Sequence, residues 1–142
     1  MIYLDAAYLA KFYLAEPDSQ RVRNAILTAP ASSSCLHGRL ETVSVFHRKL
    51  REGTVTPGEF AAHCRQFETD SASGMWTWFP ITPLLVNEAE RRIQTLPATV
   101  FLRASDALHL TCAQEHGFTT IHSSDKHLLA AAPHFGLAGV TL

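Results

Sequence analysis

Short apolar segments alternate with helical patterns along this chain, and that alternation limits the possible fold more than any other feature. Ile2–Leu4 is apolar without a polar interruption, as in a central strand covered on both faces. Ala6–Leu14 follows at once, with strong helix formers and apolar side chains at helical spacing. Because this order recurs to the end of the chain, we predict an α/β fold, a three-layer α/β/α sandwich with a mainly parallel central sheet.

Local signals place the later elements. Residues 32–35, 75–80, 118–122 and 139–142 are the further candidate strands. Thr56–Glu59 matches a helix capping box with proline at the first helical position, and Gly53–Val55 would join two antiparallel helices. The first of these helices carries an apolar stripe at helical spacing, which consists of Leu36, Leu40, Val43, Phe46 and Leu50.

Length and composition favour one globular domain, residues 1–142. No apolar run approaches the roughly 18 residues of a membrane span, and the start has no signal-type apolar region, so we expect a cytoplasmic protein without a membrane partner. The net charge of −1 excludes a globally basic nucleic-acid binder, although it allows a local basic patch.

The cysteine and histidine patterns argue against a zinc knuckle or a disulfide framework. The three cysteines, Cys35, Cys64 and Cys112, are widely spaced and contain no C-x-x-C pair, which favours small buried hydrophobes. The eight histidines are scattered without a tight ligand spacing, so most of them are interpreted as surface or packing residues.

Four acidic residues are candidates for chemistry, and each has an ordinary alternative. Asp5 and Asp125 each follow a strand and precede a helix, where an aspartate often only caps the helix. Glu41 lies beside the apolar stripe, or faces solvent near a first turn. Asp106 shares an apolar face if its helix begins at Leu102. If the helix begins at Ser105, Asp106 is a first-turn acid that complements the helix dipole, and the pattern leaves both open.

Together these acids describe one acidic pocket at the carboxyl edge of the sheet. Clustered carboxylates repel one another and raise one another's pKa, so such a cluster needs a cation. Hard oxygen ligands favour Mg²⁺ or Mn²⁺, which polarises a phosphoryl oxygen and lowers the pKa of bound water. The reaction class indicated is phosphodiester hydrolysis.

The segments around these acids resemble the motifs of PIN-domain ribonucleases, and of VapC-type toxins in particular. They are Met1–Asp5, Arg39–Glu41, Leu102–Leu110 and Ser123–Asp125. The resemblance implies that Asp5 and Asp106 are the leading metal ligands, and that Glu41 and Asp125 complete the catalytic site. It also implies an Mg²⁺- or Mn²⁺-dependent endoribonuclease, often a homodimer, that a cognate VapB-like antitoxin silences by laying its tail, frequently with an arginine, over the site.

One position departs from the family pattern. The family usually has Thr or Ser directly after the first aspartate, whereas Ala6 follows Asp5 here. Ser123 or Ser124 is a candidate source of the missing hydroxyl. Without a hydroxyl at position 6, metal affinity or rate is expected to be lower than is usual in the family.

RNA contact would require local polar and positive groups near the acids. The candidates are Lys11, Arg103, Ser123 and Lys126. An exposed Lys or Arg is more often only solvated. His109 follows Asp106 by about one helical turn, where it either packs on the helix surface or touches substrate.

Two other functions fit parts of the pattern. A catalytically weak PIN-like module that binds protein or RNA would retain RNA without metal-dependent cleavage. A phosphoacceptor receiver domain also uses acids at strand ends with Mg²⁺, but Asp5 has no adjacent second acid and no late strand ends in lysine. Metal-dependent cleavage that is lost in Asp5→Ala or Asp106→Asn distinguishes the nuclease from the module.

Overall fold

The computed structural model describes all residues, 1–142, and contains five parallel strands. The first three, β1 (Ile2–Tyr3), β2 (Ser32–Cys35) and β3 (Trp76–Phe79), pair in the order β1-β2-β3. The other two, β4 (Thr120–His122) and β5 (Ala138–Val140), pair with each other. A parallel bridge between Leu4 and His122 joins the two groups, which gives the order β3-β2-β1-β4-β5.

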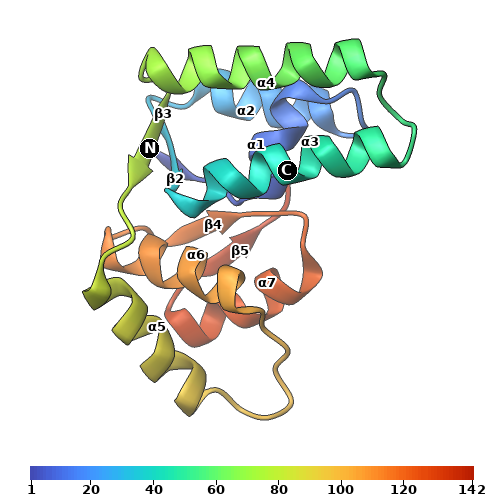
Figure 1. The fold of residues 1–142 in the computed structure, drawn as a ribbon. Helices are drawn as coiled ribbons and strands as arrows, with labels where there is room; N and C mark the ends of the chain where they lie inside the picture. The colour runs from blue at the N-terminus through green and yellow to red at the C-terminus, as the bar shows by residue number, and fades with distance from the viewer.

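Seven α-helices connect and cover the strands (Figure 1). They are α1 (Ala6–Tyr13), α2 (Ser19–Thr28), α3 (His37–Arg51), α4 (Pro57–Ala72), α5 (Pro83–Thr95), α6 (Ala104–Glu115) and α7 (Lys126–Ala131), with a 3₁₀ turn η1 (Ala132–Phe135) after α7. None of these helices is long and apolar enough to span a membrane.

Two neighbouring residues at the centre of the sheet show how the layers form. Tyr3 and Leu4 are both fully buried, and successive strand residues point to opposite faces. Tyr3 packs in a core cluster with residues of α5, α6 and α7, whereas Leu4 packs in a second cluster with residues of α1 to α4. Figure 1 shows the same division, with α1–α4 in the upper half and α5–α7 in the lower half. The predicted three-layer α/β/α sandwich with a parallel sheet is therefore confirmed.

Helix α3 packs on a different face from the one that its apolar stripe indicates. Phe46 is buried as predicted, but the side chain of Leu40 is 76% exposed. The buried residues of α3 are Gly38, Thr42 and Phe46, which are spaced by four. A Cβ at Gly38 would lie 2.9 Å from Ser34 Oγ and 3.2 Å from His109 Cε1. The helix thus approaches β2 and α6 through its smallest residue, and the predicted apolar stripe was wrong for Leu40 and for Leu36, which is 42% exposed.

The predicted helix starts are largely confirmed. Thr56 and Glu59 form the reciprocal capping box at the start of α4. Helix α6 begins at Ala104, between the two alternatives for Asp106. Asp106 is therefore a first-turn acid, yet it is also buried. Cys35 and Cys112 are buried free thiols, as expected, and Cys64 is half-buried.

Candidate active site

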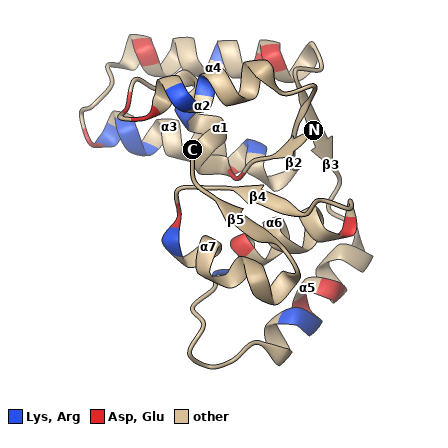
Figure 2. Cartoon of the chain, turned by 180° about the vertical axis from the view of Figure 1, so that it is seen from behind, with Lys and Arg blue, Asp and Glu red and all other residues tan.

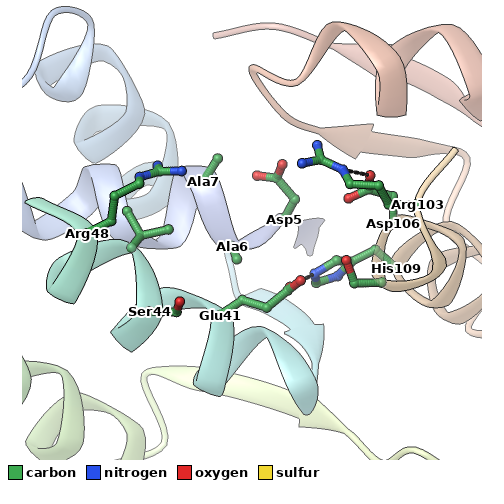
Figure 3. A pocket seen from close by; sticks show the side chains of 11 residues that line it. Asp5, Ala6, Ala7, Glu41, Ser44, Arg48, Arg103, Asp106 and His109 are labelled. Atoms are coloured by element: carbon green, nitrogen blue, oxygen red, sulfur yellow. Dashed lines mark hydrogen bonds and ion pairs between the residues drawn. The ribbon is translucent and has the colours of Figure 1, made fainter. Parts of the chain in front are cut away.

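A polar cavity of about 340 Å³ opens at the carboxyl end of β1, between the first turn of α1, the middle of α3 and the start of α6 (Figure 3). Three of the four predicted acids, Asp5, Glu41 and Asp106, line it. They come from positions far apart in the sequence, and the parallel sheet brings them together because β1 is its central strand.

Asp5 is both a helix cap and a buried acid of the cavity. Its Oδ1 accepts a hydrogen bond from the backbone N–H of Tyr8 at 3.0 Å, which caps α1. Its Oδ2 accepts one from the Ser123 hydroxyl at 2.5 Å. Ser123 thus provides the hydroxyl that Ala6 lacks, and it comes from the end of the neighbouring strand β4. The two explanations of Asp5 that the sequence left open are therefore compatible.

Burial dominates the electrostatics of Asp5 and raises its pKa to about 6. The hydrogen bond from Ser123, the nearby His109 and the N–H of Tyr8 favour the charged form, but they only partly offset desolvation. The nearby charge of Asp106 raises the pKa further. Asp5 therefore carries a poorly compensated negative charge at neutral pH.

Arg103 connects the other two aspartates. Its Nε donates to Asp106 Oδ2 at 2.9 Å, and its Nη2 pairs with Asp125. Asp125 caps α7 by accepting hydrogen bonds from the N–H groups of His127 at 2.7 Å and Leu128 at 3.3 Å. Burial alone would raise the pKa of Asp125, but those N–H groups and Arg103 lower it overall. Asp125 is linked to the site through Arg103 and does not line the cavity.

A buried hydrogen-bond chain holds Glu41. The backbone N–H of Cys35 donates to the Tyr3 hydroxyl at 3.0 Å, and that hydroxyl lies 3.1 Å from His109 Nδ1. His109 Nε2 lies 2.8 Å from Glu41 Oε2. Because the Tyr3 oxygen already accepts the amide, its own hydrogen is available to Nδ1, which leaves the Nε2–H of His109 for Glu41.

These hydrogen bonds correct the prediction for His109. The residue is 1% exposed and lines the cavity, so it does not pack on the helix surface. Burial alone would raise the pKa of Glu41, but hydrogen bonding to His109 and the nearby His37 lower it overall. Glu41 is consequently ionised and fixed in direction.

The basic candidates are placed unequally. Arg103 lines the cavity, whereas Lys11 and Lys126 do not, and Lys11 instead lies 5.8 Å from the centre of the Tyr8 ring. Arg48 also lines the cavity, and Figure 3 shows it on the opposite side of Asp5 from Arg103. Sequence reasoning missed Arg48. Its spacing of seven residues from Glu41, two helical turns on the same face of α3, was a usable signal.

The sequence profile that describes the PIN domain matches residues 2–133. The chain belongs to the PIN-domain family. The crystal structure of VapC20 from Mycobacterium tuberculosis, a sarcin-ricin loop cleaving toxin, is similar to this PIN domain with a TM-score of 0.74. The two are 14% identical, over 92% of this chain and 95% of that chain.

A structure of FitAB bound to an IR36 DNA fragment is similar to it with a TM-score of 0.62. The identity is again 14%, over 99% of this chain and 94% of that chain. At this identity the likeness is one of fold. No curated protein sequence matches the chain.

The residues of this PIN domain fit a divalent cation. Asp5 and Asp106 are buried carboxylates beside a cavity of ample size, and the pKa of Asp5 shows that its charge lacks full compensation. Carboxylate oxygens of this kind suit Mg²⁺ or Mn²⁺, which also keep several water ligands. Ala6 and Ala7 form an adjacent wall with small side chains, which leaves space over the two acids.

Proposed function

We propose that this PIN domain, residues 1–142, is a Mg²⁺- or Mn²⁺-dependent endoribonuclease that acts as the toxin of a toxin–antitoxin pair. The observation that carries the proposal is the convergence of Asp5, Glu41 and Asp106 on one cavity, with Asp125 joined to them through Arg103. The similarity in fold to the VapC20 toxin supports RNA as the substrate class.

Each acid has a separate role in the proposed hydrolysis. Asp5 and Asp106 hold the cation, and when bound it polarises the phosphoryl oxygen and makes a bound water more acidic. Glu41, which contacts His109, would orient the attacking water and accept its proton. Ser123 keeps Asp5 in position through its hydrogen bond, and Asp125 fixes the direction of the Arg103 guanidinium.

Arg48 and Arg103 are the proposed contacts for the RNA backbone. They lie on opposite sides of Asp5 and line the same cavity, so phosphates on both sides of the scissile bond would meet a guanidinium (Figure 3). Figure 2 shows that basic and acidic segments are interspersed over the helices in that view, with basic ones at the end of α3, where Arg48, Lys49 and Arg51 lie. Lys11 and Lys126 are more distant candidates.

Cleavage of labelled structured RNAs tests the proposal. The purified protein should cut them with Mg²⁺ or Mn²⁺ and not with EDTA, and Asp5→Asn and Asp106→Asn should lower kcat by at least about 100-fold. Arg91→Gln, at an exposed position of α5, is the matched control and should cleave normally. Cleavage by Asp5→Asn at the normal rate contradicts the proposal. RNA binding without cleavage would support the alternative, a binding module.

Arg48→Ala tests the RNA path separately. It should weaken RNA binding for all sequences and reduce the slope of log affinity against log salt by about 1, as for loss of one phosphate contact. An unchanged salt slope in filter binding would remove Arg48 from the proposed path.

The toxin role has its own test. Induced expression in bacteria should arrest growth, whereas Asp5→Asn should not, and co-expression of a small neighbouring reading frame should restore growth. Such a frame would encode the VapB-like antitoxin. Light scattering of the purified protein should show the proposed homodimer. Equal toxicity of the wild type and Asp5→Asn contradicts the toxin role.

A further inference from the structure

A second group of metal-ligand atoms lies beside the acidic cavity. The side chains of His37, Glu41 and His109 each offer one ligand atom, and these atoms all lie within 4.8 Å of one another. Glu41 Oε2 is 3.6 Å from His37 Nε2 and 2.8 Å from His109 Nε2. His37 and Glu41 lie one turn apart on α3, and α6 brings His109 against them with 4.2 Å between the two ring centres.

We propose that His37, Glu41 and His109 form a second cation site, distinct from the Asp5 and Asp106 pair and selective for transition ions such as Zn²⁺ or Co²⁺. The proposal concerns ion binding and stands whether or not the protein cleaves RNA.

The distances suit coordination by one small ion. In a tetrahedral site, bonds of about 2.0 to 2.1 Å place neighbouring ligand atoms about 3.3 to 3.4 Å apart. The separations of 2.8 and 3.6 Å lie on either side of that distance, and all three ligand atoms lie within 4.8 Å of one another, so shifts of the two histidine rings would bring the three atoms onto one ion. The backbone oxygen of Ser105 lies 3.1 Å from His37 Nε2 and offers a fourth ligand. Ser105, Glu41 and His109 also border the cavity, which leaves an open position for water.

Ion binding at His109 requires the tautomer opposite to the one that donates to Glu41 in the absence of metal. An ion takes the Nε2 lone pair, so the ring proton must move to Nδ1. The Tyr3 oxygen lies 3.1 Å from Nδ1 and can accept a hydrogen bond from the Nδ1–H once the hydroxyl hydrogen turns away from the ring. Metal-bound histidines usually have such a partner on the other ring nitrogen, which fixes the ring orientation.

The donor set separates this site from the acidic one. Imidazole nitrogens favour Zn²⁺, Co²⁺ and related ions, whereas Mg²⁺ prefers oxygen ligands throughout. Because Glu41 belongs to both arrangements, an ion bound to the histidines would occupy the carboxylate that the acidic cavity also uses. If the proposed function is correct, Zn²⁺ would consequently inhibit Mg²⁺-dependent cleavage.

The test is titration of the metal-free full chain with Zn²⁺ by calorimetry, and with Co²⁺ by visible absorption. His37→Gln and Glu41→Gln should weaken Zn²⁺ binding by about 10- to 100-fold or more, and should change the Co²⁺ spectrum. His47→Gln replaces an exposed histidine of the same helix and should bind as the wild type does. Asp5→Asn and Asp106→Asn should also retain Zn²⁺ binding.

Several results would overturn the proposal. They are the absence of Zn²⁺ and Co²⁺ binding, unchanged binding in both His37→Gln and Glu41→Gln, or loss of binding in Asp5→Asn. Circular dichroism without metal shows which variants are folded, and using two ligand variants keeps the test valid if one of them is not. Zn²⁺ should also raise the Tm of the wild type more than that of Glu41→Gln, a readout that needs no RNA.

Discussion

The imidazole of His109 lies 2.8 Å from the carboxylate of Glu41, and this contact joins α6 to α3 at the edge of the acidic cavity. The imidazole is buried, whereas the Glu41 side chain is 30% exposed. The buried partner thus determines where the exposed partner points. His109 is a positioning residue in this arrangement, because it acts on the site through Glu41.

His109→Leu should lower kcat for RNA cleavage by about 10- to 100-fold and leave KM nearly unchanged, because a hydrogen bond to a charged group is worth about 1.5 to 3 kcal/mol. His109→Gln retains a donor for Glu41 and should recover part of the loss. The control is His134→Gln, which changes an exposed residue in η1. Equal kcat in the Leu and Gln variants would argue against positioning.

Asp5→Asn should stabilise the metal-free protein at pH 7 by about 1 to 3 kcal/mol, since the pKa of Asp5 rises from 3.8 to about 6 on folding. An acid whose pKa is higher in the folded state destabilises the fold once it ionises. The free energy of unfolding should therefore fall as pH rises from 3.8 to about 6, and stay reduced above. Urea unfolding across pH 4 to 8 measures this, and the Asn variant should lack the fall over that window.

The low pKa values of Glu41 and Asp125 act in the opposite direction. Their contribution to stability is fully present above the pKa of the unfolded group, 4.5 for Glu41 and 3.8 for Asp125, and is lost at more acidic pH, so it offsets the Asp5 effect only at the acidic end of the window. If Asp5→Asn is less stable than the wild type at pH 7, the hydrogen bonds of Asp5 to the Tyr8 N–H and to Ser123 stabilise the fold by more than its buried charge destabilises it.

Arg103→Gln should lower the Mg²⁺ or Mn²⁺ concentration needed for half-saturation by about two- to fivefold. Its guanidinium pairs with Asp106 and Asp125 and so competes with a cation for the same charges. The side chain is 55% exposed, so the competition is worth only about 0.4 to 1 kcal/mol. Calorimetric titration of Mn²⁺ measures it, with Arg91→Gln as the control. Weaker ion binding in Arg103→Gln would mean that Arg103 organises the acids.

Gly38→Ala should destabilise the protein by about 1 to 3 kcal/mol, because the added Cβ would lie 2.9 Å from Ser34 Oγ and 3.2 Å from His109 Cε1. The matched control is Gly58→Ala in the first turn of α4, where only Thr56 Oγ1 lies within 4 Å. Chemical unfolding compares the two. If the free energy of unfolding falls equally in both variants, the close approach of α3 to α6 does not explain the effect of Gly38→Ala.

Much of the fold follows from local signals. The apolar run at Ile2–Leu4 and the capping box at Thr56–Glu59 depend on residues close in sequence, and the structure has both elements as predicted. The face of α3 was mispredicted because Gly38 and Thr42 pack where leucines do not. Helix packing depends on the shape of the facing surface, which apolar spacing alone does not describe.

The sequence by itself determined which acids are available and that strands and helices alternate, since both are properties of short segments. Only the tertiary structure decided that Ser123 binds Asp5 across 118 residues, that His109 holds Glu41, and that Arg103 joins Asp106 to Asp125. These contacts require the parallel order β3-β2-β1-β4-β5, which places the ends of distant strands side by side. Burial at that edge, which no single segment encodes, raises the pKa of Asp5, and the contact with His109 from another helix lowers the pKa of Glu41.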